Sequence, residues 1–584
     1  MRFSKKYSVG KRYTASLLTV LAGSVATGSV SAIEFELGEV EGRFDSSISF
    51  GVSKRMEDRD PELISSGNGG TGFSNVGDDG DLNFDKGDVF SRTLKGVHDL
   101  SLRKDNVGAF VRVKWWNDFE LKDGDRLHGH EPNDATGGRP LDDTDFHDLA
   151  QFSGGEILDA FVFAEMEVNE KPLDLRVGKQ VVNWGESTFI QGGINVVNPV
   201  DVSAFRRPGA ELKEGLLPVN MVYANFGATD NLTVEGFYQL DWEKTVLDGC
   251  GTFFSGGDFV PDGCDRITFA GAIPDADNYA AGTIVNRAAD NEAEDSGQYG
   301  LGLRYYSEAM DAELGFYYTN YHSRLPYISV QKSSNGLPLL GGGAGIEYLI
   351  EYPEDISLVG VSIATSIGEW AVSGEISHRD GMPIQINGPE ILAAALAGAP
   401  TTFLPNWNAA ANGSVISGFD RYDVTQAQVT FVRFFERVAG ASRLTVVGEV
   451  GATLVHDLPG IDEQRYGRAP VFGAGSLGVG PNPDDGYVTD SAWGYRLLAQ
   501  LDYSNVFSGV SLAPRVFLRH DVSGYSPDPG QQFQEGRQSV GFGLKASYRD
   551  TYTANLSYTR FGDNGDFDIM RDRDFISLDF GVTF

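Results

Sequence analysis

Beyond residue 32, the sequence has no apolar run long enough for a transmembrane helix. This absence excludes a helical membrane protein. Basic residues are also scarce, since 47 Lys and Arg stand against 82 Asp and Glu, and the formal net charge is −35. So acidic a chain is not expected to bind nucleic acid.

Catalytic motifs are missing as well. The chain has no G-x-S-x-G sequence, and its eight histidines are scattered. Lipases and proteases of the outer membrane need a Ser, a His and an acid, or paired carboxylates with His. An outer-membrane lipase or protease is therefore the less favoured class, and the sequence predicts neither a catalytic residue nor a cofactor.

Only two cysteines are present, Cys250 and Cys264, and both fall in the polar stretch 243–297. An exported chain meets an oxidising compartment. A pair this close in one loop favours a disulfide over two free thiols. The same stretch contains no histidine, so we expect no metal site between the sulfurs.

The first 32 residues have the pattern of a secretory signal peptide. A basic head precedes a short apolar run at 17–22, and Val30-Ser31-Ala32 is a small-x-small cleavage site. We therefore expect residues 33–584 to form the mature, exported chain. No linker or charge block divides that part, so it is expected to be one domain.

The mature chain alternates between apolar and polar residues in segment after segment. The last segment ends at Phe584, with Ile576, Leu578 and Phe580 on one face and Ser577 and Asp579 on the other. Because side chains alternate across a strand, this code is typical of a barrel that is apolar to lipid and polar to its lumen. An edge strand of a soluble β-sandwich is the alternative for this one segment.

About 18 such segments can be found, or 16 or 14 if weak pairs belong to loops. Tight turns such as Gly368-Glu369 and Ser508-Gly509 alternate with long polar loops. Short periplasmic turns and long external loops are the pattern of an outer-membrane barrel. The predicted fold is a transmembrane antiparallel β-barrel in the outer membrane of a Gram-negative bacterium, in contact with membrane lipid and lipopolysaccharide.

The stretch 177–218, called here the constriction segment, breaks this rhythm. It is too apolar for a mobile external loop and too irregular for a strand, and Asn198-Pro199 and Arg207-Pro208-Gly209 are turn signals. We expect it to fold into the barrel as a constriction; a compact surface loop is the alternative. We expect Trp184, Phe189, Ile190 and Phe205 to contact cargo, and Asn183, Asn198, Asp201, Arg206 and Arg207 to hold the segment to the wall. Arg206 or Arg207 would also be able to meet a carboxylate head group on the cargo.

The runs GKQVVNWGES, GGINVVNPVD and FRRPGAELKEGLLP within this segment resemble an uncharacterised outer-membrane family, domain of unknown function thirteen-oh-two. The resemblance extends over essentially all of the mature chain. It implies a wide barrel that is functionally analogous to fatty-acid and hydrocarbon transport barrels. It also implies two partners, a periplasmic lipid-carrier-like protein and an inner-membrane lipid-exporter-like permease.

Together with this resemblance, the apolar constriction segment predicts a channel for hydrophobic compounds such as an alkane, fatty acid, sterol or lipid. The sequence does not assign a direction of transport. The alternative is a general or selective diffusion porin for small polar solutes.

Acidic runs in the long loops offer oxygen ligands. Asp79, Asp81, Asn83 and Asp85 have a spacing that suits Ca²⁺, but the pattern fails as an EF-hand because Phe84 and Phe90 occupy its sixth and twelfth positions. Solvation is the favoured explanation of such runs, and bound divalent ions are the alternative.

Overall fold

The computed structural model describes residues 32–584, apart from 131–132, 134, 332–345, 398–410, 412, 476–477 and 479. The predicted signal peptide thus lies almost wholly outside the described residues. No helix in the described ranges is both long and apolar enough to cross a bilayer.

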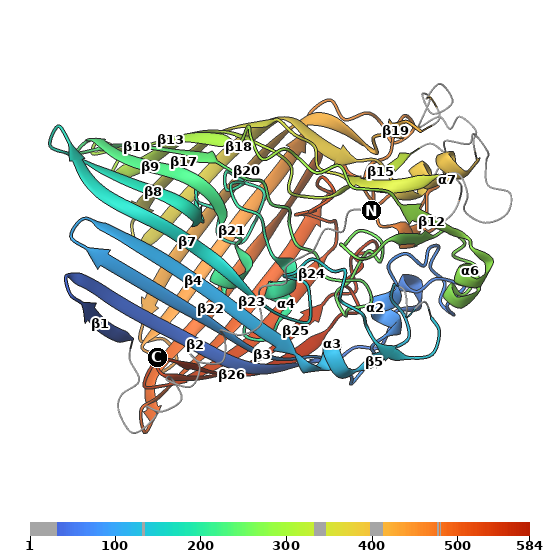
Figure 1. Ribbon diagram of the computed structural model, residues 1–584, viewed down its shortest axis with the longest axis horizontal. Coiled ribbons are helices and arrows are strands. Elements are labelled where there is room, and N and C mark those ends of the chain that lie inside the picture. Colours follow the sequence, from blue (N-terminus) through green and yellow to red (C-terminus); the bar gives the residue numbers. More distant parts are fainter. Residues whose placement is uncertain are drawn as a thin grey trace, which may run out of the picture.

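The predicted antiparallel barrel is confirmed, with eighteen wall strands that close on themselves where β2 pairs with β26 (Figure 1). Every neighbouring pair in the wall is antiparallel, and sequential strands are adjacent. The wall strands are β2 (Val40–Arg55), β3 (Val89–Lys104), β4 (Val107–Asp118), β7 (Ser153–Val168), β8 (Lys171–Gln180), β9 (Val219–Thr229), β10 (Leu232–Gln239), β13 (Tyr299–Ser307), β14 (Ala312–Tyr321), β17 (Ile356–Ile367), β18 (Trp370–Gln385), β20 (Phe419–Glu436), β21 (Arg443–Val455), β22 (Ser491–Phe507), β23 (Val510–Ser523), β24 (Gln538–Tyr548), β25 (Tyr552–Phe561) and β26 (Phe575–Thr583).

Hairpin turns gather at one end of the barrel and long loops at the other (Figure 1). At the turn between β7 and β8, Asn169 and Glu170 both have positive φ, the conformation of a two-residue turn that matches strand twist. Before the first wall strand, β1 (Ile33–Leu37) pairs with the start of β2. Because short turns are periplasmic in such barrels, the long loops are external.

The outer surface is apolar, and its side chains alternate with the polar ones that face inward. Exposed outward residues include Phe50, Val162, Val222, Leu301, Phe316, Val361, Ile376, Phe431, Val450, Leu497, Val516, Phe542, Leu556 and Phe580. In water, this much exposed apolar surface would cause aggregation. Facing lipid instead, it makes the chain an outer-membrane barrel.

Above the external end lies a structured cap, which we define as the five-stranded sheet together with loops 56–88 and 243–297. Its buried core includes Val76, Phe259, Tyr348 and Ile350. The sheet consists of β11 (Arg266–Thr268), β12 (Ile284–Arg287), β16 (Glu347–Glu351), β15 (Tyr327–Gln331) and β19 (Val415–Ile416). The smaller elements around it are η1 (Pro61–Leu63), α2 (Asp79–Leu82), α3 (Phe119–Asp123), β5 (Asp125–Arg126), β6 (Arg139–Pro140), α6 (Asp275–Ala281), α7 (Gly388–Ala397) and η2 (Pro470–Phe472).

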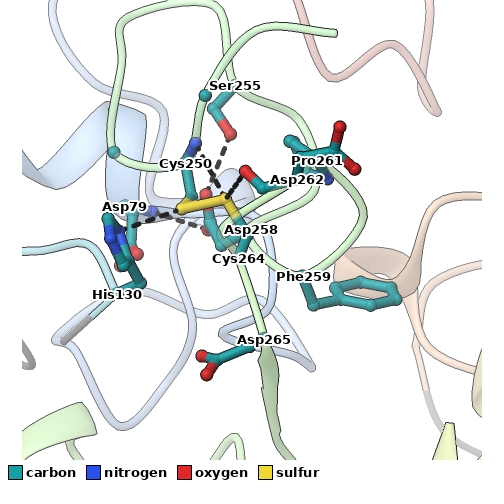
Figure 2. The surroundings of a disulfide bond; sticks show 12 residues. Asp79, His130, Cys250, Ser255, Asp258, Phe259, Pro261, Asp262, Cys264 and Asp265 are labelled. Atoms are coloured by element: carbon teal, nitrogen blue, oxygen red, sulfur yellow. Dashed lines mark hydrogen bonds between the residues drawn. A yellow bond between two sulfur atoms is a disulfide. The ribbon is translucent and has the colours of Figure 1, made fainter. Parts of the chain in front are cut away.

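The predicted disulfide joins Cys250 to Cys264 within the cap, and both cysteines are fully buried (Figure 2). Replacing both with serine is expected to destabilise the cap by about 3 kcal/mol, because the bond closes a short loop in the unfolded chain. Limited proteolysis of intact outer membranes, with cleavage sites read by mass spectrometry, checks this. Cutting confined to the same sites at the same rate in the double variant would contradict it.

Candidate functional site

The constriction segment lies inside the barrel, as predicted (Figure 1). Its first four residues complete β8, and the remainder is irregular apart from α4 (Val202–Arg206) and α5 (Leu212–Gly215). Asp201 caps α4, since its Oδ1 accepts the N–H of Ala204. The segment therefore has a defined conformation of its own.

Two buried wall carboxylates hold the middle of the segment. Glu449 of β21 accepts backbone N–H groups from Thr188, Phe189 and Ile190 at 2.6–2.8 Å. Glu375 of β18 accepts the N–H groups of Glu186 and Ile194. Hydrogen bonds to a charged acceptor are each worth about 1.5–3 kcal/mol. The five bonds fix residues 186–194 against the wall.

Other wall side chains donate hydrogen bonds to the carbonyl groups of the same stretch. Arg379 of β18 donates to the carbonyls of Gly192 and Gly193, and Gln426 of β20 donates to Gln191 at 2.8 Å. The backbone of residues 186–194 therefore has both hydrogen-bond acceptors and hydrogen-bond donors on the wall. These bonds take the place of pairing with a neighbouring strand.

Glycines in the wall form recesses that receive the apolar side chains of the segment. A Cβ at Gly300 would lie 2.7 Å from the Trp184 ring, one at Gly360 would lie 2.6 Å from Ile194, and one at Gly451 would lie 2.9 Å from Ile190. Any larger residue at Gly300, on β13, would therefore displace the indole. Trp184 also donates its ring N–H to Glu235 of β10 at 2.8 Å.

The residues predicted to contact cargo are mostly turned away from the passage. Trp184 and Ile190 are each 1% exposed. Phe189 is half-buried and meets Phe517 of β23 edge-on, and Phe205 packs on Gly215. These contacts do not test whether the four residues touch cargo during transport, so that role stays a prediction.

The two predicted arginines lie near the cap. Arg206 lies over the ring of Phe254 and forms an ion pair with Asp248 at 3.3 Å. Arg207 is buried over Trp116 and donates to the carbonyl of Leu149. Both guanidinium groups thus have partners within the protein.

The residues predicted to anchor the segment make contacts within it or with the wall. Asp201 pairs with Lys114 of β4 at 2.7 Å. Asn198 accepts the N–H of Val182 and donates to the carbonyl of Leu217. Asn183 contacts Asn195 inside the segment. A second buried pair, Lys95 of β3 with Glu214 at 2.6 Å, holds the end of the segment.

The face that holds the segment is the lumen face, and it carries charges of both signs. Phe517 contacts Phe189 from this face, and Arg515 shares it because it lies two residues away on the same strand. Cross-strand pairing extends the face through Lys545, Asn555 and Asp579. Charged lumen residues elsewhere include Asp99, Arg112, Asp159, Arg176, Glu235 and Arg304.

A cavity of about 270 Å³ lies between the segment and the external part of the wall. Its polar lining includes Gln191, Asn195, Arg324 and Arg379. Its apolar lining includes Val181, Val196, Leu325, Ile356, Met382, Pro527 and Pro529. The cavity is the size of a small organic solute.

The chain matches the family described as "Protein of unknown function (DUF1302)" over residues 13–584. No curated protein matches it. Solved structures that are similar include OccAB4 from Acinetobacter baumannii, with TM-score 0.41 and 9% identity, covering 94% of this chain and 98% of that one. OccK1 (OpdK) from Pseudomonas aeruginosa has TM-score 0.37 and 11% identity, covering 93% and 98%. A BenF-like porin from Pseudomonas fluorescens Pf-5 has TM-score 0.38 and 10% identity, also covering 93% and 98%.

Likeness at this level says nothing about what this chain transports. The family match covers nearly the whole sequence, and the chain therefore belongs to the DUF1302 family.

Proposed function

We propose that the protein is a selective diffusion channel for small polar solutes. The sequence gives this channel as its alternative, and it favours a channel for hydrophobic compounds because the constriction segment is rich in aromatic and aliphatic residues. A protein of this kind performs no chemistry on its solute, so the proposal involves no catalytic group.

The observation that carries the proposal is the orientation of the constriction segment. Its buried side chains include Val182, Trp184, Ile190, Ile194 and Val197, all apolar. In the stretch 181–198 the exposed side chains are Asn183, Thr188 and Gln191, all polar. Trp184, Ile190 and Ile194 fill recesses in the wall, and the side chains of this stretch that are exposed toward the passage are polar.

The wall supports the same proposal. Arg112 pairs with Asp99 and Asp159, and Arg304 pairs with Glu235, so cations and anions alternate around the lumen. A lumen of this kind holds water and resists the entry of alkyl chains.

The cavity beside the segment refines the class of solute. It combines hydrogen-bonding groups of Gln191 and Asn195 with the aliphatic surface of Val196 and Ile356. Sites of this type orient a ligand by a few polar contacts and hold its apolar body. We expect permeation to favour compact molecules with a polar group and a small apolar body over large sugars.

Conductance of the purified protein in planar bilayers tests the proposal, together with swelling of proteoliposomes in small organic acids, amino acids and sugars. Steady single-channel conductance and uptake of the small solutes are expected. A deletion strain should then grow normally on alkanes and lipids. Absent conductance and swelling, with a growth defect confined to hydrophobic substrates, would overturn the proposal in favour of a channel for hydrophobic compounds.

A further inference from the structure

Four aspartates meet inside the cap, away from the lumen. Carboxylate oxygens of Asp78, Asp79 and Asp258 all lie within 4.8 Å of one another. Asp79 also belongs to a second group with His128 and Asp275, whose ligand atoms meet the same limit. Loop 56–88 and loop 243–297 each supply two of the four aspartates, so the cluster lies where the two loops join.

Three of the four aspartates have no lysine or arginine as an ion-pair partner in the part of the chain that the structure describes. These are Asp78, Asp258 and Asp275; His128 contacts Asp275 at 3.2 Å. Asp78 is fully buried and Asp275 is 3% exposed. Carboxylates this buried need a proton or a cation.

Two buried oxygens at the cluster lack a hydrogen-bond partner. Asp78 is held through Oδ2, which accepts the Ser65 N–H at 2.9 Å and the Asn68 amide at 3.1 Å, while its Oδ1 has no partner. Asn75 donates its amide to Asp275 at 2.6 Å and leaves its Oδ1 without one. Buried polar atoms are almost always satisfied, so two orphaned oxygens beside three carboxylates point to a missing ligand.

We propose that this cluster binds one Ca²⁺ ion, coordinated by Asp78, Asp79 and Asp258, with Asn75 or Asp275 as a further oxygen ligand. Ca²⁺ takes 6–8 oxygen ligands at about 2.3–2.6 Å, so two ligands of one ion lie at most about 5 Å apart. The carboxylate oxygens of Asp78, Asp79 and Asp258 lie close enough together to meet this requirement. All proposed ligand atoms are hard oxygens, which favour Ca²⁺ over softer metals.

An ion at this position would cross-link the two loops beside the disulfide. Asp79 and Asp258 belong to the surroundings of Cys250–Cys264 in Figure 2, and the Asp79 N–H already donates to Asp258 at 3.2 Å. The disulfide closes one loop on itself, whereas the ion would join that loop to its neighbour. Ca²⁺ would therefore set the rigidity of the cap above the channel mouth.

Calcium titration of the chelator-treated, purified full-length protein tests this. Isothermal titration is expected to show one Ca²⁺ ion per chain at or below about 1 mM, as in external calcium modules. Asp78→Asn and Asp258→Asn should each weaken binding by about tenfold or more. Ca²⁺ should also protect loops 56–88 and 243–297 from protease in the wild type and not in these variants.

Asp563→Asn is the matched control, because Asp563 is an exposed external aspartate whose side chain is 82% accessible. Its calcium affinity should equal that of the wild type. Heat-modifiable migration on gels shows for each variant whether the barrel is intact. No calcium binding by the wild type near 1 mM, or equal affinity in both cluster variants with intact barrels, would overturn the proposal.

Discussion

Replacing Glu449 with alanine is expected to open the channel. The buried carboxylate accepts three consecutive N–H groups of the constriction segment, and no water reaches it to replace them, since Glu449 is fully buried. Each bond to a charged acceptor contributes about 1.5–3 kcal/mol, and each orphaned N–H adds a similar cost. The stretch 186–194 should leave the wall, and single-channel conductance should rise by about twofold or more.

Planar-bilayer recording of the purified variant measures this change. Glu165→Gln is the matched control, because Glu165 of β7 pairs with Arg103 at the exposed rim and does not contact the segment. Its conductance should stay near that of the wild type. A closed or unchanged Glu449→Ala channel in a correctly assembled barrel would show that the segment is held by other contacts.

Replacing Arg55 with alanine is expected to destabilise the external end of the barrel strongly. Arg55 ends β2 and pairs with Asp81 at 2.9 Å and Asp572 at 2.7 Å; Arg573 binds Asp81 from just before β26. Arg55 and Asp81 are buried. Removing one partner of a buried network leaves an uncompensated charge and costs about 3–5 kcal/mol. The network spans the seam where the barrel closes.

The temperature at which the barrel loses its heat-resistant migration on gels measures this loss. Arg560→Ala removes an exposed arginine whose partner, Asp563, lies 3.9 Å away, and exposed pairs contribute at most about 1 kcal/mol. This control should melt like the wild type. If the two variants melted at the same temperature, the seam network would have no role in closure.

The wall was predictable because its signals are local. Side-chain alternation depends only on neighbouring residues, and a turn such as Gly368-Glu369 identifies both adjoining strands, β17 and β18. Strand ends were less predictable. Alternation alone does not show where β18 ends; the strand runs to Gln385 because its external end pairs with β20 and packs in the cap.

The constriction segment was predictable as a buried element, but its orientation was not. An apolar side chain such as Trp184 has the same sequence signature whether it faces a passage or a wall. What decides is the space at Gly300 and Gly302, over a hundred residues later in the chain. In the sequence, a glycine within a strand indicates only a weak strand propensity, because the side chain that packs against it is not known.

The wall partners gave no sequence signal at all. Glu375 and Glu449 occupy ordinary lumen-facing positions in alternating strands, like many other polar residues of the chain. Their role comes from backbone groups 181 to 261 residues away. The five-stranded sheet of the cap was missed for a similar reason, since its strands are short and pair across long loops.

The clamping of residues 186–194 by Glu375 and Glu449 imposes an order on assembly. The clamped stretch follows β8, yet its acceptors are on β18 and β21, which enter the wall much later along the chain. Contacts between residues so distant in sequence form late in folding. The segment can therefore be locked in its final position only after β18 and β21 have joined the wall, so the lumen gains its constriction from strands that are added long after the segment itself.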